Sequence, residues 1–271
     1  MQSVFDNGGI IGQTMDFAST EKYILSESID TITQIGSVGG GAVNGGSITL
    51  SLTSLNLQEG DVLIIMVGAA DSGAEPPLLP TTSGVTMFGS YLYGNDSEDI
   101  TMEVGYYICG ATPPTSMTSL STGDADNSSV HIIQAYRGVD ISSLPFLFTT
   151  ATGINSSYIN PPAITTSVNN SVVVCVGAAS ESAPYVFTST DLSGFHSYVG
   201  GNDTYDGAGG MGYKEISTAG TFDAVQWSSS GSGSLQAWAG MSIVLEPKTI
   251  INYGNYKNSG IWKLSSVINS I

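Results

Sequence analysis

The chain has 271 residues, of which 41% are hydrophobic and only 11% are charged. Its 23 acidic residues outnumber its 6 basic ones, which gives a formal net charge of −17. The hydrophobic content excludes a disordered acidic tail, and the negative field repels phosphate backbones, so we expect no nucleic-acid partner.

The first 46 residues differ from the central part of the chain. They begin without the positively charged and continuous apolar regions of a signal peptide, so we expect no export signal. Residues 36–46 read GSVGGGAVNGG, a composition typical of a flexible linker. We therefore predict that residues 1–46 are an N-terminal docking segment that ends in a glycine-rich hinge.

Residues 47–247 have the pattern of short strands separated by turns. Residues 101–106 alternate polar and apolar positions, as in a half-buried strand. The runs 62–67 and 172–176 are apolar throughout, as in central strands covered on both faces. Clusters of turn-forming residues separate the runs. The expected strands are residues 47–52, 62–69, 85–92, 100–109 and 130–136, then 171–178, 194–199, 210–216, 224–228 and 234–245.

Landmarks in the first half of this region recur in the second half in the same order. The string VGAA recurs at 67 and 176, Ser-Gly at 83 and 193, Gly-Asn-Asp at 94 and 201, and Gly-Tyr at 105 and 212. VHIIQAYRGV from Val130 lies opposite AWAGMSIVLEP from Ala237. These offsets of 107–110 residues indicate an internal duplication, with copies at 47–139 and 158–246.

About ten strands in two related halves predict an all-β fold, an antiparallel β-sandwich of jelly-roll-like type over residues 47–247. The sequence leaves open whether the copies form one sandwich or two. One intimate body is favoured, because five short strands make a thin core on their own.

The last 24 residues, 248–271, have a charge of opposite sign. They contain Lys248, Lys257 and Lys263 and no acidic residue, whereas residues 1–247 carry −20. Ile261, Leu264, Val267, Ile268 and Ile271 follow a helical spacing. This pattern predicts a short amphipathic helix that docks either on the chain's own sandwich or on a partner.

We expect no catalytic residue and no cofactor. His131 and His196, the two histidines, lie in strand-like runs, where a structural role is the simpler interpretation. Cys109 and Cys175 lie in apolar runs typical of buried free thiols. No segment reaches the length of about 18–20 apolar residues that spans a bilayer, so we expect no membrane insertion.

Oxygen-rich loops at 95–99, 124–127 and 202–206 could supply calcium ligands, but none follows the spacing of a known calcium loop. Solvated turns are the favoured interpretation, and no metal site is predicted. Tyrosines beside Asn and Asp could instead stack on a sugar and bind its hydroxyls. The residues of this candidate ligand site are Tyr91, Tyr93, Asn95, Asp96, Asn202, Asp203, Tyr205 and Asp206.

The terminal segments resemble a family of phage proteins. SVFDNGGIIGQTMDF at residues 3–17 resembles the N-terminal signature of virion structural proteins from marine tailed bacteriophages, especially those of cyanobacteria. NSGIWKL at residues 258–264 is similar to a closing motif of the same group. The middle resembles β-sandwich modules of phage and bacterial surface proteins, in which a Gly-Asp pair before an apolar strand and a later YRGV recur. These strings are Gly60-Asp61 and residues 136–139 in this sequence, and the second copy lacks YRGV.

The resemblance implies a non-enzymatic virion structural protein, assembled in the host cytoplasm and displayed on the particle as a tail-fibre-like appendage or a head or neck decoration that aids host adsorption. It implies other virion proteins as partners, a homo-oligomer in the particle, and a host-surface glycan as a further partner. The expected partner-docking residues are Phe5, Ile10, Ile11, Phe17, Ile261, Trp262, Leu264 and Ile268. The alternative function is a carbohydrate- or calcium-binding adhesin module.

Overall fold

The structure is a computed structural model that describes residues 22–42, 47–70, 79, 84–90, 92–94, 99–120, 128–156, 158–181, 186–200, 206–230 and 235–255. These residues form antiparallel strands and two short 3-10 helices, η1 (Thr53–Leu55) and η2 (Ile141–Ser143), and include no α-helix. The chain divides into two units. One spans Asp30–Lys248, and the other combines Met1–Ile29 with Thr249–Ile271. The predicted all-β class is confirmed.

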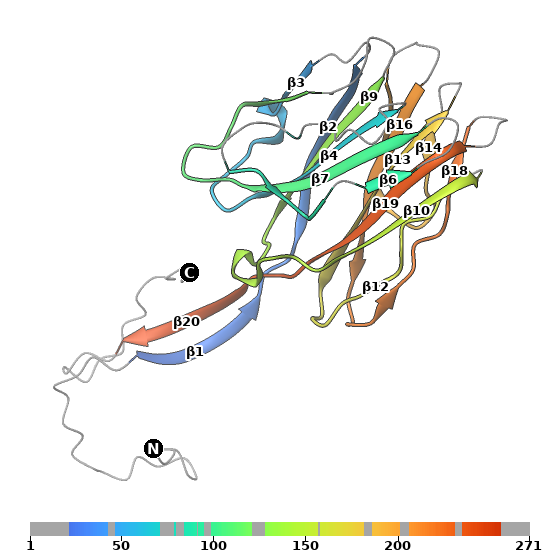
Figure 1. Ribbon diagram of the computed structural model, residues 1–271. Helices are drawn as coiled ribbons and strands as arrows, with labels where there is room; N and C mark the ends of the chain where they lie inside the picture. Colours follow the sequence, from blue (N-terminus) through green and yellow to red (C-terminus); the bar gives the residue numbers. More distant parts are fainter. Residues whose placement is uncertain are drawn as a thin grey trace, which may run out of the picture. The chain divides into compact units, whose positions relative to one another are not determined.

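Two large sheets form the centre of the first unit (Figure 1). The six-stranded sheet has the order β2 (Thr33–Ala42), β9 (Ser129–Arg137), β4 (Val62–Ala70), β7 (Ile100–Ile108) and β5 (Thr86–Met87), and β6 (Leu92–Gly94) also pairs with β7. The five-stranded sheet has the order β10 (Phe148–Ser156), β19 (Leu235–Leu245), β13 (Ser171–Glu181), β16 (Asp206–Ile216) and β15 (Ser193–Val199).

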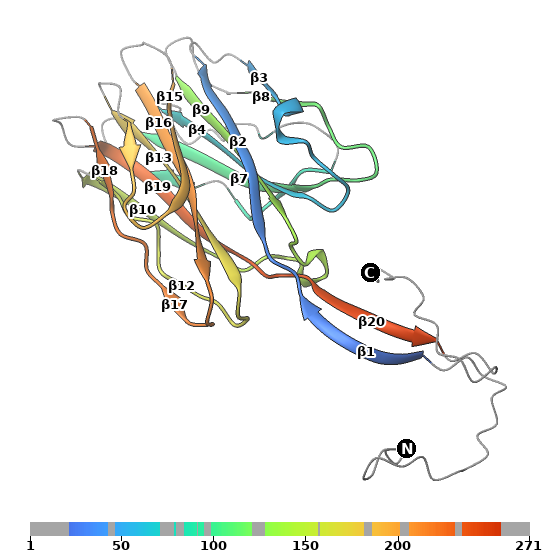
Figure 2. The ribbon, with the colours of Figure 1, turned by 180° about the vertical axis from the view of Figure 1, so that it is seen from behind.

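Smaller sheets belong to the same unit. One pairs β3 (Ser47–Ser51) with β8 (Ser116–Leu120). Another has the order β11 (Tyr158–Ile159), β18 (Trp227–Ser229) and β14 (Phe187–Thr188), and the last pairs β12 (Ile164–Thr165) with β17 (Thr221–Phe222). Figure 2 shows the opposite side of the molecule, where β12 and β17 extend together from the five-stranded sheet.

Three clusters of apolar side chains lie between these sheets. The largest lies between the two large sheets and takes side chains from β4, β7 and β9 on one side and from β13, β16 and β19 on the other. A second cluster lies between the six-stranded sheet and the β3–β8 pair, with Leu50 and Met117 from the small sheet. A third lies between the five-stranded sheet and its small sheets, with Ile159, Phe187 and Trp227.

The central strands β4 and β13 are buried on both faces, as their continuous apolar runs predict. In β4, Ile64 and Met66 belong to the shared cluster, while Ile65 belongs to the outer one. In β13, Val174 faces the shared cluster and Cys175 the outer one. Every residue of β4 is buried. A strand in such a position needs apolar side chains at successive residues rather than at alternate ones.

Strand β7 differs from its sequence pattern. The alternation over residues 101–106 predicts one solvent-exposed face, but residues 100–106 are all buried. Thr101 and Glu103, on the polar face, lie 0% and 6% exposed. The small β3–β8 sheet and Leu79 belong to the cluster on this side of the sheet, so polar residues face the interior rather than water.

The predicted glycine-rich hinge is wrong for residues 36–42, which belong to the edge strand β2. The glycines allow β15 to come close. A Cβ atom at Gly39 would lie 2.4 Å from the ring of Tyr198, and one at Gly41 would lie 2.3 Å from the carbonyl oxygen of Val199. Glycine within a strand is typical of such close approaches. The first unit therefore begins at Asp30 rather than at the expected residue 47.

The two large sheets have the same strand order if the five strands of each, β6 left aside, are numbered by their position along the chain, which is first, fifth, second, fourth, third. β2, β9, β4, β7 and β5 in one sheet correspond to β10, β19, β13, β16 and β15 in the other. In the ladders Tyr106 lies opposite Ile64 and Tyr213 lies opposite Val174, and all four side chains contact the shared cluster. The two VGAA strings differ in orientation, since Val67 faces an outer cluster and Val176 the shared one.

A polar side chain fixes the two large sheets to each other. Gln134 of β9 is 0% exposed, and its Nε2 donates to the carbonyl oxygens of Gly194 (2.9 Å) and Met211 (3.0 Å) in the other sheet. Its Oε1 accepts a hydrogen bond of 2.6 Å from the hydroxyl of Tyr136. All of these groups are satisfied inside an apolar core, where an unpaired one would cost about 1–3 kcal/mol.

The second unit contains an antiparallel ribbon of β1 (Lys22–Ile29) and β20 (Thr249–Asn255). Lys22 lies opposite Asn255, and Ile29 lies opposite Thr249. Residues 249–255, predicted as the start of a C-terminal docking segment, therefore form a strand. The predicted helix and the docking residues Phe5, Ile10, Ile11, Phe17, Ile261, Trp262, Leu264 and Ile268 lie outside the described residues.

Candidate functional site

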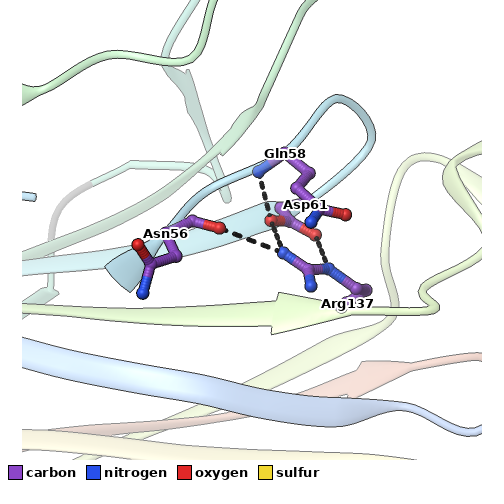
Figure 3. Close-up of polar contacts among 4 residues, drawn as sticks. All are labelled: Asn56, Gln58, Asp61 and Arg137. Atoms are coloured by element: carbon purple, nitrogen blue, oxygen red, sulfur yellow. Dashed lines mark hydrogen bonds and ion pairs between the residues drawn. The ribbon is translucent and has the colours of Figure 1, made fainter. Parts of the chain in front are cut away.

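The Gly-Asp and YRGV strings, which are distant in sequence, meet in the structure. Asp61 precedes β4 and Arg137 ends β9, and these strands are neighbours in the six-stranded sheet. Arg137 donates from Nε to Oδ1 of Asp61 and from Nη2 to Oδ2, both at 2.8 Å (Figure 3). This two-point contact matches the planar guanidinium to the carboxylate.

The loop before β4 completes this arrangement. The backbone N–H of Gln58 donates to Oδ2 of Asp61 at 2.7 Å, and Nη2 of Arg137 also reaches the carbonyl oxygen of Asn56 at 3.3 Å. Asn56 has a left-handed backbone, with φ of 48°. Asp61 is 1% exposed and Arg137 is 42% exposed. The pair ties the loop 56–61 to the end of β9, which is a structural role.

The second half lacks this contact. The residue at the start of β13 is Ser171, whose hydroxyl donates to the carbonyl oxygen of Val168 at 2.6 Å. The residue after β19 is Glu246, which accepts a hydrogen bond of 3.2 Å from the hydroxyl of Ser167. The absence of YRGV from the second half therefore coincides with local hydrogen bonds in place of the ion pair.

His131 lies on the buried outer face of β9. Both ring nitrogens are hydrogen-bonded, Nδ1 with the hydroxyl of Ser119 on β8 and Nε2 with that of Ser129 at 2.8 Å. Burial lowers the pKa of His131 from 6.5 to about 4, so the ring is neutral at pH 7. Both nitrogens of His131 are hydrogen-bonded, and only 1% of the residue's surface is exposed. Through Ser119 it links the six-stranded sheet to the small β3–β8 sheet.

Glu103 lies on the same face of the sheet. Glu103 and His131 both lie opposite Val67, from the two strands that flank β4. The backbone N–H of Leu79 donates to Oε2 of Glu103 at 3.0 Å, and burial raises the pKa of Glu103. The structure thus places two titratable groups on either side of one valine. The alternating pattern of β7 gave no signal for the burial of Glu103.

The candidate ligand site is described only in part. Tyr91, Asn95, Asp96, Asn202, Asp203 and Tyr205 lie outside the described residues, and only the backbone of Asp206 is described, in β16. Tyr93 of β6 is half-buried and donates a hydrogen bond from its hydroxyl to Oδ2 of Asp99. In the sequence, the candidate residues Asn95 and Asp96 lie between Tyr93 and Asp99.

The two cysteines are free and buried, as predicted. Burial is the main cause that raises the pKa of Cys109 to about 11 and that of Cys175 to about 12. Because the thiolate is the nucleophile, both groups are unreactive in the folded chain at neutral pH.

The second histidine, His196, is exposed. Its ring stacks against the ring of Tyr198, with ring centroids 6.5 Å apart.

Within the described ranges, no group of three or more His, Cys, Asp and Glu side chains is placed to hold a metal ion. Over the same part of the chain, no helix has the length and apolarity needed to cross a membrane. The comparison with family models finds no match for this sequence, and the comparison with curated proteins finds none either.

Replacement of Arg137 by Met is expected to lower the free energy of unfolding by about 1–3 kcal/mol, because the buried carboxylate of Asp61 loses its counter-charge. The effect is smaller than for a fully buried pair, since Arg137 is 42% exposed. Arg137→Lys keeps the charge but not the two-point contact, so its stability should fall between the two. Urea unfolding measures this order, and equal stability of wild type and Arg137→Met would contradict the assigned role.

The stability of the protein should fall as the pH is lowered from 6.5 towards 4. The unfolded chain takes up a proton on His131 near pH 6.5, while the folded chain resists it until about pH 4. Between pH 7.5 and 5, wild type should lose about 2 kcal/mol more than His131→Asn.

Glu103 contributes with the opposite sign, because its folded-state pKa is raised and its stabilising contribution is lost as the pH rises. The difference between wild type and His131→Asn, rather than either slope alone, therefore isolates His131. The exposed His196, replaced by Asn, is the matched control. Identical pH profiles for wild type and His131→Asn would contradict the assignment.

Proposed function

We propose that this chain is a non-enzymatic structural protein of a tailed-bacteriophage virion, displayed on the particle as a tail-fibre-like appendage or a head or neck decoration. It is attached through both of its terminal segments and aids adsorption to the host. Its partners are other virion proteins, and the protein is located in the particle. The resemblance of residues 3–17 and 258–264 to virion proteins is the first support for this proposal.

The register of the terminal ribbon is the observation that carries the proposal. Lys22 lies opposite Asn255 in the β1–β20 pair, so the chain enters and leaves this ribbon at the same end. Residues 1–21 and 256–271, which contain the two strings that resemble virion proteins, therefore start from adjacent positions. Segments joined in this way can act as one attachment site, since binding of one keeps the other near the same partner.

The fold supports a further part of the proposal, that each half of the chain is a jelly-roll-like module. In the first half β2, β9, β4 and β7 are neighbours in that order, and in the second half β10, β19, β13 and β16 are neighbours in that order. Outside these sheets, β3 pairs with β8 in the first half and β11 pairs with β18 in the second half. This order supports a jelly-roll-like architecture, of the kind used by viral capsid and lectin domains.

Packing between the sheets supports an origin of the two modules by duplication. β4 packs against its counterpart β13. β2 packs against β15, β9 against β16, and β7 against β19. The strands of the five-stranded sheet therefore follow the opposite order to the matching strands of the six-stranded sheet that they cover. Such an arrangement is that of a two-fold related pair of modules within one chain.

The alternative, a carbohydrate- or calcium-binding adhesin module, uses the loops around Asn95 and Asn202. Six of its eight candidate residues lie outside the described part of the chain, and Tyr93 and Asp206 are the two within it. A lectin-like role is compatible with the same architecture.

Particles purified from cells that produce the phage should contain the chain, by mass spectrometry and by immunogold electron microscopy. Ile261→Ala/Trp262→Ala should reduce incorporation more than tenfold, because each buried large apolar side chain contributes about 1.5–3 kcal/mol to attachment. Lys257→Ala/Lys263→Ala is the matched control, and it should incorporate almost normally because exposed ion pairs contribute little. Both variants should keep the unfolding midpoint of wild type.

Absence of the chain from purified particles would contradict the virion role. Normal incorporation of Ile261→Ala/Trp262→Ala would show that the attachment site lies elsewhere, with residues 1–21 as the next segment to truncate.

A further inference from the structure

The edges of the two large sheets differ in how they are protected. β2 and β5 are the edge strands of the six-stranded sheet, and β10 and β15 are those of the five-stranded sheet. An edge strand presents unpaired N–H and C=O groups that can pair with another chain. Soluble proteins block such pairing with bulges, very short strands, charged residues, proline or a covering segment.

Three of these edges carry such features. β5 has only two residues. β2 has a register shift between Gln34 and Gly36, and its glycines lie against Tyr198 and Val199. β15 has a shift between Ser193 and His196, and it packs against β2. These irregular or covered strands are poor templates for a further strand.

β10 has no bulge and is not short, although β6 packs against it and the hydroxyl of Thr149 donates to the carbonyl oxygen of Ala163 at 3.2 Å. It has nine residues, FTTATGINS, with no charge and no proline. Its ladder with β19 runs without a register shift, and no strand in the described part of the chain pairs with its other side. Thr150 and Thr152 are exposed. Ile154 and Leu147, the residue just before the strand, are each 54% exposed, although both are large aliphatic side chains.

We propose that β10 pairs with β10 of a second copy of this chain, in antiparallel orientation about a two-fold axis near Thr152. The two five-stranded sheets then form one continuous sheet across the dimer. In this arrangement Thr150 lies opposite Ile154 of the partner strand. Threonine and isoleucine are both β-branched, and β-branched residues are enriched in strands.

The charge distribution favours a second copy as the occupant. The chain carries −17, so most of its surface repels a copy of itself. An interface with two-fold symmetry brings each residue near its own equivalent, and a charged residue on the axis would meet a like charge. β10 is uncharged along its whole length. It is therefore a surface on which two copies meet without direct like-charge contacts.

The oligomeric state of the full chain tests this inference, and the test does not depend on a role in the virion. Sedimentation velocity at roughly 1–200 μM should show a monomer–dimer equilibrium, in the range expected for a small interface. Thr152→Lys, which places two lysines opposite each other at the axis, should shift the dimer dissociation constant at least tenfold upwards. Thr86→Lys, on the exposed edge strand β5, is the matched control and should dimerise as wild type does.

Thermal unfolding of both variants at low concentration separates loss of pairing from loss of folding. Thr152→Lys should have the midpoint of wild-type monomer, because Thr152 is exposed in the isolated chain. If Thr152→Lys unfolds early, Thr150→Lys replaces it in the same comparison. A wild-type chain that stays monomeric at about 200 μM, or a dimer that persists in the folded lysine variant, would overturn the proposal.

Discussion

The structure depends on the apolar contact between its two large sheets. Each of the central strands β4 and β13 has two faces to bury, and only one of these faces is covered by the small sheets of its own half. The other face is covered by the opposite half, through Ile64 and Met66 on one side and Val174 and Val176 on the other. Separation of the two halves would expose a continuous apolar surface of each large sheet to water.

The position of this contact is fixed by polar groups. Apolar packing tolerates small shifts, whereas a buried hydrogen bond is lost when its partners move by one residue. Gln134 binds two carbonyl oxygens of the opposite sheet, and the hydroxyl of Ser128 accepts from the backbone N–H of Gly207. These bonds allow a single register between the sheets. The glycines of β2 add a steric fit against β15 at one side of the contact.

The central strands and the edge strand β15 could be predicted from sequence, whereas the edge strands β2 and β10 could not. The runs that became β4, β9, β13 and β19 are long and apolar because both of their faces are buried. β2 and β10 consist largely of Gly, Ser and Thr, and their place in the fold depends on neighbours distant in sequence. Matching strings do not fix which face a side chain takes, because a shift of one residue turns it to the opposite face of a sheet, and Val67 and Val176 of the two VGAA strings face different clusters.

For the candidate site, the sequence provided the Gly-Asp and YRGV strings but not their contact, which arises because β4 and β9 are neighbours. The structural interpretation of His131 agrees with its burial and its two serine partners. Glu103 was missed because its strand alternates as a half-exposed strand does, and only the tertiary fold covers its polar face. The terminal docking residues and most of the loop residues lie outside the described chain and stay predictions.

Because the two halves share a core, both should unfold as one unit. The two cysteines report on this separately, since Cys109 lies in the first half and Cys175 in the second, and both are buried. Pulsed alkylation over a urea series, read by mass spectrometry, measures the fraction of each thiol that has become accessible. If both halves unfold together, Cys109 and Cys175 become accessible with the same midpoint. Two separate midpoints, with one half unfolding while the other stays protected, would contradict it.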